Sequence, residues 1–386
     1  MIRSRWARRT LSCLLAGLAA AAGWAGDLPN ERQTVARLDG DTRYRLYLAD
    51  PAMSHLIDGR LHVVDGRQMR YLSAMSTGFA GQWALSPDRR ELYVATTYYS
   101  RLHRGTRSDV VEVYGTDDLA LRHEIEIPPR HAQALNIRGT VQPSADGRWL
   151  LVQNATPAST VTVVDLAGRR VASEVPTPGC WGVIPWPHQP SRFSTVCGDG
   201  TLVTVELDAQ GQALPRTTGV RFFDPDADPV FIHYDWRGDT LYFITYGGEV
   251  RPLQAAVAGV QPLPTWSLLT EAERKAGWRP GGYELFAIDA VQNRLFVGMH
   301  RNAADGAHKT PAQQIWVLDL DGQRRLARWP GQNAIAMTLS GREQPRLFLL
   351  DAEKNGLVAF DARSLQGKPL ARFDGVGETP VYLEAH

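Results

Sequence analysis

Short apolar runs in which β-branched and aromatic residues alternate with polar ones recur along the whole chain. The second run of each repeating unit often ends in an acid, as in LHVVD, VVEVY, VTVVD, LVTVE, IWVLD and LVAFD. The first runs begin near Leu46, Leu92, Trp149, Phe193, Leu241, Leu295 and Leu347. Alternation of this kind predicts half-buried β-strands.

The strands are separated by polar turns and repeat with a period of about fifty residues. Turns rich in Asp, Gly and Asn, such as SPDRREL, SADGRWL, DWRGDTL and DAVQNRL, precede the first strands. Seven copies can be followed, although the second strand of the fifth copy, VRPLQAA, is weak. A β-helix would have a much shorter period, and two stacked sandwiches would not repeat seven times. The pattern predicts an all-β fold, a seven-bladed β-propeller, in which each sheet buries its faces against its neighbours.

One segment breaks the strand pattern. In LLTEAERKAG, residues 268–277, Thr270 is placed to cap a helix and Glu273 follows three residues later. This spacing predicts a capping box. We expect a short helix inserted between strands on one face of the ring.

The first 25 residues differ from the rest in composition. Four arginines, Arg3, Arg5, Arg8 and Arg9, precede the short apolar run LSCLLAGLAAAAGWAG. This order predicts an export signal over residues 1–25, cut near Ala25, and a propeller domain over residues 26–386. The alternative, a membrane anchor, needs about twenty strongly apolar residues. The general secretory route and the twin-arginine route both stay open, and either leads to the periplasm.

Removal of this segment changes the charge of the chain. It carries four arginines and no acid, so its loss would shift the formal charge from +1 to about −3. A nearly neutral chain without a basic block is a poor match for nucleic acid. No second apolar run follows, so no membrane span is expected.

Two cysteines, Cys180 and Cys197, follow the predicted signal. Their spacing fits neither a zinc site nor a redox C-x-x-C pair. In an oxidising compartment we therefore expect a structural disulfide, which stabilises the fold by about 3 kcal/mol. The segment between them is rich in proline, so we expect the bridge to fix a loop between the third and fourth blades that has little regular hydrogen bonding.

The sequence carries none of the common catalytic motifs. The sequence holds no G-x-S-x-G, H-E-x-x-H or phosphate-binding loop, and its ten histidines do not pair at metal-binding spacings. No catalytic residue and no metal site is predicted from spacing. Ligands on separate blades could still meet at the axis of a propeller, so an axial metal stays open.

Several long strings resemble the heavy subunit of quinoprotein amine dehydrogenases. They are YYSRLHRGTRSDVVEVY, LVQNATPASTVTVVDL, GCWGVIPWP with STVCGDG, LLTEAERKAGWRPGGY and GAHKTPAQQIWVLDLDGQRRLARWPG, spread over nearly the whole chain after the signal. DPAMSHL, LVQNATPAS and GCWGVIPWP are more similar to aromatic amine dehydrogenase than to methylamine dehydrogenase.

The resemblance implies a periplasmic heterotetramer of two heavy and two small subunits. In that family the small subunit carries tryptophan tryptophylquinone, formed from two of its own tryptophans, and oxidatively deaminates a primary amine to an aldehyde and ammonia. Electrons then pass to a blue-copper protein of the azurin or amicyanin type. This chain would bind no cofactor alone, and it would supply a scaffold, a substrate channel and a docking surface.

The resemblance also implies one contact with substrate. Heavy chains of the family place a phenylalanine at the entrance to the quinone site, and STGFAGQW, residues 76–83, matches that loop with Gly78 and Phe79. The alternative role for Phe79 is that of a packing aromatic between blades. For the whole chain, the rival hypothesis is a free-standing propeller, either a binding module or a metal-dependent lactonase-like hydrolase.

Overall fold

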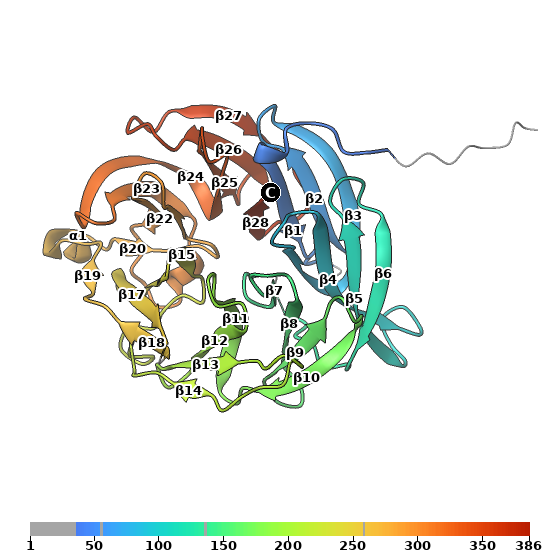
Figure 1. Cartoon of the computed structure of the whole chain (residues 1–386). Coiled ribbons are helices and arrows are strands. Elements are labelled where there is room, and N and C mark those ends of the chain that lie inside the picture. The colour runs from blue at the N-terminus through green and yellow to red at the C-terminus, as the bar shows by residue number, and fades with distance from the viewer. Residues whose placement is uncertain (1–35, 55–56, 135–136, 258) are drawn as a thin grey trace, which may run out of the picture. The chain divides into compact units, whose positions relative to one another are not determined.

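The strands form sheets arranged around a common centre, as the computed structural model shows (Figure 1). The structure describes residues 36–54, 57–134, 137–257 and 259–386. The predicted export signal of residues 1–25 lies outside the described residues. Arg37–His386 form one unit by their internal contacts, and the all-β propeller expected from the repeat is confirmed.

Strand pairing divides the described part of the chain into five sheets. The first has the order β28-β1-β2-β3-β4-β5-β6, with β1 Arg45–Asp50, β2 Gly59–Asp65, β3 Arg70–Leu85, β4 Glu91–Tyr99, β5 Arg107–Gly115, β6 Leu121–Ile127 and β28 Tyr382–Ala385. The second has the order β10-β9-β8-β7, with β7 Val141–Pro143, β8 Trp149–Asn154, β9 Thr160–Asp165 and β10 Arg170–Pro176. The third has the order β11-β12-β13-β14, with β11 Cys180–Pro185, β12 Arg192–Cys197, β13 Leu202–Glu206 and β14 Thr217–Thr218.

The remaining two sheets complete the ring. The fourth contains β15 Asp235–Arg237, β16 Thr240–Ile244, β17 Glu249–Ala256, β18 Gly259–Pro262 and β19 Trp266–Ser267. The fifth contains β20 Arg279–Pro280, β21 Phe286–Asp289, β22 Arg294–His300, β23 Ala312–Asp319, β24 Arg324–Ser340, β25 Arg346–Asp351, β26 Gly356–Asp361 and β27 Pro369–Phe373. Short 3-10 helices cover Thr42–Tyr44 (η1) and Ala307–Lys309 (η2).

Two long strands each run from one blade-like unit into the next. The first part of β3 pairs with β2, and its last part pairs with β4 after a register shift between Phe79 and Gln82. Likewise, β24 pairs with β23 and then with β25, with a shift between Ala334 and Ala336. Dividing the first and the fifth sheet at these irregularities turns five sheets into seven units. The count of seven blades stays a prediction that depends on this division.

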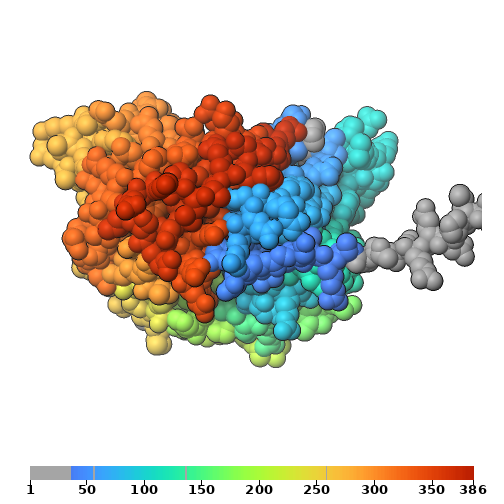
Figure 2. All heavy atoms as spheres, turned by 90° about the horizontal axis from the view of Figure 1, so that it is seen from above, coloured from blue at the N-terminus to red at the C-terminus, as the bar shows by residue number. Residues whose placement is uncertain are grey.

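The last strand closes the ring against the first. β28 pairs antiparallel with β1, and the register places Leu46 opposite Ala385 and Ala49 opposite Tyr382. Figure 2 shows the C-terminal part of the chain, in red, against the N-terminal strands, in blue. Hydrogen bonds between the two ends of the chain therefore hold the propeller closed.

Neighbouring sheets share their buried apolar side chains. Tyr93 and Ala95 of β4 belong to the same cluster as Leu150 and Val152 of β8, although β4 and β8 lie in different sheets. Burial of apolar area against the next sheet is the main favourable contribution to stability in such a ring.

The predicted helix is present and short. α1 spans Glu271–Lys275, with Thr270 as its N-cap. The Glu273 amide donates to Thr270 Oγ1 at 3.3 Å, and the Thr270 amide donates to Glu273 Oε2 at 2.9 Å. The capping box is confirmed. None of the helices in the described ranges is long and apolar enough to cross a membrane.

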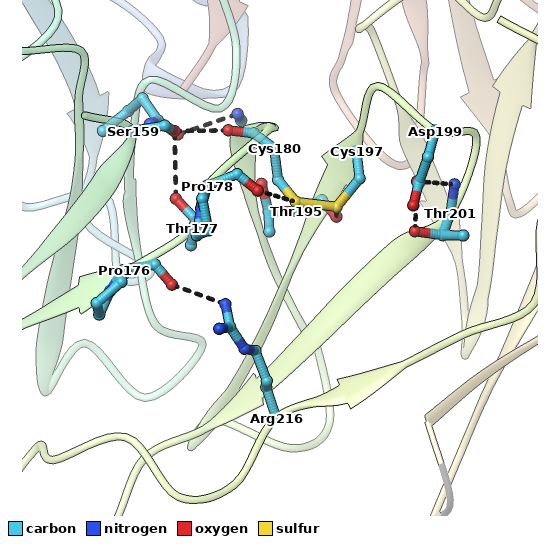
Figure 3. Close-up of a disulfide and its surroundings, with 12 residues drawn as sticks. Ser159, Pro176, Thr177, Pro178, Cys180, Thr195, Cys197, Asp199, Thr201 and Arg216 are labelled. Atoms are coloured by element: carbon cyan, nitrogen blue, oxygen red, sulfur yellow. Dashed lines mark hydrogen bonds between the residues drawn. A yellow bond between two sulfur atoms is a disulfide. The ribbon is translucent and has the colours of Figure 1, made fainter.

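Cys180 and Cys197 form the expected disulfide, but its position differs from the expectation (Figure 3). The two residues are directly opposite each other on β11 and β12, with a Cα–Cα distance of 3.9 Å. The expectation of a loop with little regular hydrogen bonding was wrong, because CWGVIP forms strand β11 and pairs with RFSTVC. The bridge therefore joins two strands of one sheet.

Candidate functional site

In the segment from Gly78 to Gly81, the pairing partner of β3 changes from β2 to β4. Gly78 has a φ of +65°, and a Cβ there would lie 2.5 Å from Thr96 Oγ1. A Cβ at Gly81 would lie 2.0 Å from the Thr77 carbonyl oxygen. Residues with a side chain would clash at both positions, so the two glycines allow the backbone to turn closely at this junction.

Phe79 lies at this junction and is half-buried. It is opposite Thr97 in the register of β3 and β4, and its ring meets Tyr99 edge to face, with centroids 5.7 Å apart. Phe79 is thus not a fully buried core residue, and one side of its ring is fixed by an aromatic contact. Its contact with substrate stays a prediction.

Two exposed side chains with apolar groups lie on β4 and in the turn that follows it. Tyr98, next to Tyr99 on β4, is 45% exposed, and Leu102 in the β4–β5 turn is 68% exposed. Leu102 has a φ of +65°, a conformation that costs energy for a residue with a side chain. Tyr98 lies between Thr97, the partner of Phe79, and Tyr99, so its side chain points to the face of the sheet opposite Phe79, where its hydroxyl donates to Glu112.

A buried carboxylate lies beneath the junction. Asp109 of β5 is fully buried and accepts hydrogen bonds from Arg107 Nε (2.7 Å) and Nη2 (2.6 Å) and from His131 Nδ1 (2.8 Å). Thr97 Oγ1 donates to it at 2.8 Å. Burial alone would raise the pKa of Asp109, but the bonds from His131 and Arg107 outweigh it and hold the pKa well below its usual range.

A buried amide connects the junction to the next sheet. Gln82 Nε2 donates to the Ala134 carbonyl at 2.6 Å, and Thr140 Oγ1 donates to Gln82 Oε1 at 2.7 Å. Sequence reasoning missed Gln82, Asp109 and His131, since they come from separate strands and loops and share no spacing motif. For Gln82 and Asp109 the signal was a polar side chain inside an apolar strand, whereas His131 lies after β6, outside the named strands.

A second cluster of charged side chains lies where several sheets meet. Glu284 and His233 are buried, and Glu284 Oε1 lies 3.8 Å from His233 Nδ1 and 3.7 Å from Arg138 Nε. Glu284 Oε2 accepts the Leu383 amide of β28 at 3.1 Å. Burial raises the pKa of Glu284 to about 8, with Arg138 acting in the opposite direction.

The tautomer of His233 follows from its neighbour. His233 Nε2 lies 2.8 Å from the Phe286 carbonyl, which can only accept, so Nε2 carries the proton and Nδ1 is a lone-pair acceptor. Burial lowers the pKa of His233 to about 3, with a further contribution from Arg138. Among the described residues, no group of three or more His, Cys, Asp or Glu side chains is arranged to hold a metal ion.

Comparison with known proteins identifies the family. The sequence profile of the methylamine dehydrogenase heavy chain family matches residues 41–385. The methylamine dehydrogenase heavy chain of Methylobacillus flagellatus is 28% identical over 340 residues, covering 87% of this chain and 83% of that protein. The heavy chain of Paracoccus versutus is 28% identical over 351 residues, covering 89% of this chain and 79% of that protein.

Solved structures show the fold alone. A candidate 6-phosphogluconolactonase from Bacteroides fragilis superimposes with a TM-score of 0.61 at 10% identity, covering 92% of this chain and 99% of that one. A protein of unknown function from Desulfotomaculum acetoxidans gives a TM-score of 0.58 at 11% identity, covering 86% and 96%. The sequence match, in contrast, extends over nearly all of the described residues, and the chain belongs to the methylamine dehydrogenase heavy chain family.

Proposed function

We propose that this chain is the heavy subunit of a periplasmic quinoprotein amine dehydrogenase that converts primary amines to an aldehyde and ammonia. The observation that carries the proposal is the family match over residues 41–385. Family membership supports the subunit role, because the matching proteins are named as heavy chains and cover most of this chain.

The catalytic group of the proposed enzyme belongs to a partner. We propose two heavy subunits with two small subunits, each small subunit carrying tryptophan tryptophylquinone, and a blue-copper protein of the azurin or amicyanin type as electron acceptor. The quinone supplies the carbonyl chemistry and accepts the electrons of the amine. This chain then contributes a docking surface and apolar walls, and the half-buried Phe79 is suited to such a wall.

For Phe79 we propose a position on the wall of the substrate channel, next to Gly78. Support comes from its half-buried ring at a junction where two glycines allow a close backbone turn. An apolar ring without ionisable groups can select substrates by shape but cannot transfer a proton. We therefore expect this chain to affect amine preference rather than the chemical step.

The finer proposal is that the preferred substrates are aromatic amines. It depends on the similarity of DPAMSHL, LVQNATPAS and GCWGVIPWP to aromatic amine dehydrogenase. The edge-to-face pair of Phe79 and Tyr99 agrees with it, since aromatic rings pack well against such edges.

Co-purification tests the subunit role. The full chain carries an affinity tag and is expressed with the neighbouring reading frames of its native locus. We expect a small cysteine-rich polypeptide to co-purify in equal amounts and to bring a quinone absorbance. Purification of the tagged chain alone, in the presence of an expressed small subunit, would contradict the proposal.

The rival hypothesis has one observation in its favour, the superposition on a candidate lactonase. At 10% identity this similarity shows a shared fold and carries no activity. Lactone hydrolysis by the purified chain with added divalent cations would favour the rival, and we expect none above the buffer rate.

A further inference from the structure

A pocket of about 440 Å³ opens between the segments that precede β15 and β21, the β16–β17 turn and η2. Its size is within the range of small-molecule sites in proteins. Its larger described side chains include Phe231, Ile232, Tyr246, Tyr283, His308 and Lys309, and Ala134, Ile137, Val230 and Gly282 complete the described lining.

Backbone hydrogen bonds hold the walls of this pocket in place. The Phe231 amide donates to the Ile244 carbonyl at 3.0 Å, and the Tyr246 amide donates to Pro229 at 2.9 Å. On the opposite side, the Tyr283 amide donates to Ile335 at 2.6 Å and the Gly282 amide donates to His308 at 2.9 Å. These bonds fix the walls that carry the aromatic rings, which lowers the entropic cost of binding against them.

One wall of the pocket is a stack of rings. Tyr246 and His308 are stacked, with centroids 5.0 Å apart and planes 13° apart. The Phe231 ring lies 4.5 Å from that of Tyr246. Such a wall favours a flat apolar or aromatic group.

The polar groups of the pocket determine the sign of the charge it prefers. Lys309 Nζ lies 5.4 Å from the centre of the Tyr283 ring and has no ion-pair partner among the described residues. No carboxylate belongs to the described lining. Lys309 is the one charged side chain in the described lining, so the pocket favours an anion.

The hydroxyl groups provide further donors. Within the described ranges, neither the Tyr246 nor the Tyr283 hydroxyl has a hydrogen-bond partner, although both residues are half-buried. Burial and the charge of Lys309 lower the pKa of His308, so its ring is neutral near pH 7. Two phenol donors and one ammonium group around an aromatic wall match a carboxylate attached to a ring.

We propose that this pocket binds a small aryl carboxylate, with its ring against Phe231 and Tyr246 and its carboxylate at Lys309. The proposal does not depend on the dehydrogenase role, because every group it uses belongs to this chain.

Calorimetric titration of the purified full chain with benzoate and with phenylacetate tests the proposal. Lys309→Met should weaken binding at least 10-fold, and Tyr246→Phe should weaken it by a smaller factor. Lys354→Met, at an exposed lysine in the β25–β26 turn, is the matched control and should leave it unchanged. Benzamide and benzylamine, with neutral and cationic head groups, should bind at least 10-fold more weakly than benzoate.

Several results would overturn the proposal. They are the absence of benzoate binding at millimolar concentration, equal binding of benzylamine, and binding that does not change in Lys309→Met. Amine oxidation by the co-purified complex is measured separately. A co-purified complex that oxidises no amine would contradict the proposed function and would leave the pocket proposal unaffected.

Discussion

Two buried carboxyl groups in this propeller have similar neighbours, but their pKa values are shifted in opposite directions. Asp109, beneath the Phe79 junction, and Glu284, where β28 meets the fifth sheet, each lie near one arginine and one histidine. Asp109 is contacted by Arg107 and His131 at 2.6–2.8 Å, and its pKa is lowered. Glu284 has its arginine and histidine at 3.7 and 3.8 Å, and its pKa is raised.

Contact geometry, and not the kinds of neighbouring residues, therefore decides the charge state of these two carboxyl groups. Hydrogen bonds of normal length compensate for the free-energy cost of removing the Asp109 carboxylate from water. Glu284 accepts one backbone amide, and its Oε1 has no hydrogen-bond partner among the described residues, since Arg138 and His233 lie too far away. A buried acid without such bonds avoids the cost by keeping its proton.

The largest effect is expected from Asp109→Asn. The change leaves Arg107 without its carboxylate, and removal of one partner of a buried pair costs about 3–5 kcal/mol of unfolding free energy. Glu284→Gln is the matched change, because an amide resembles the protonated acid, and it should cost less than about 1 kcal/mol at pH 6.5. Chemical denaturation of both variants measures the difference, and equal losses would show that the two regions do not differ as described.

Replacement of Cys180 and Cys197 by serine should cost about 3 kcal/mol. The bridge lies outside both regions and joins strands that also pair through their backbones, so the sheet should still form. Circular dichroism checks the strand content and a melting curve checks the stability. Peptide mass spectrometry that finds two free thiols in the native protein would refute the bridge.

Phe79→Ala should change substrate preference by about 1–3 kcal/mol, measured as the ratio of kcat/KM for an aromatic and an aliphatic amine in the complex. Leu370→Ala, at an exposed apolar residue of β27, is the control and should leave the ratio unchanged. A packing role predicts the reverse result, a loss of about 3–5 kcal/mol of stability with an unchanged ratio.

The last expected effect is a dependence of stability on pH. Between the ordinary pKa of Glu284, 4.5, and its folded value of about 8, the folded chain holds a proton that the unfolded chain has released. Stability therefore falls as pH rises through this range and levels off above it. Asp109 acts in the opposite direction, since its lowered pKa gives stability that is lost as pH falls below about 3.8.

The free energy of unfolding at pH 6.5 and at pH 9 isolates the contribution of Glu284. The lowered pKa of Asp109 affects stability only below about 3.8, and the lowered pKa of His233 affects it only below about 6.5. Glu284→Gln should flatten the decline between the two pH values. An unchanged decline in the variant would assign the slope to another group.

The sequence was sufficient for those features that depend on local pattern. Alternation in segments such as VTVVD and LVAFD predicted the strands, and Thr270 with Glu273 predicted the helix cap. Two remaining cysteines predicted the disulfide, but the prolines near Cys180 hid strand β11, since Pro185 lies at the end of the strand, where its missing amide is tolerated.

The two carboxylate clusters could not be predicted. Asp109 meets Thr97 and His131 only because β4, β5 and the segment after β6 are brought together by the sheet. Glu284 meets Arg138, which is 146 positions earlier in the sequence, only when the ring closes. Contacts of such separation depend on the register and closure of the whole propeller, which no local pattern contains.

We propose that this chain shapes access to a reaction that another chain performs. Amine-dependent dye reduction by the full chain alone, by the small subunit alone and by their complex tests it most directly. We expect turnover by the complex and none by the full chain alone. Amine oxidation by this chain without a second polypeptide would contradict it.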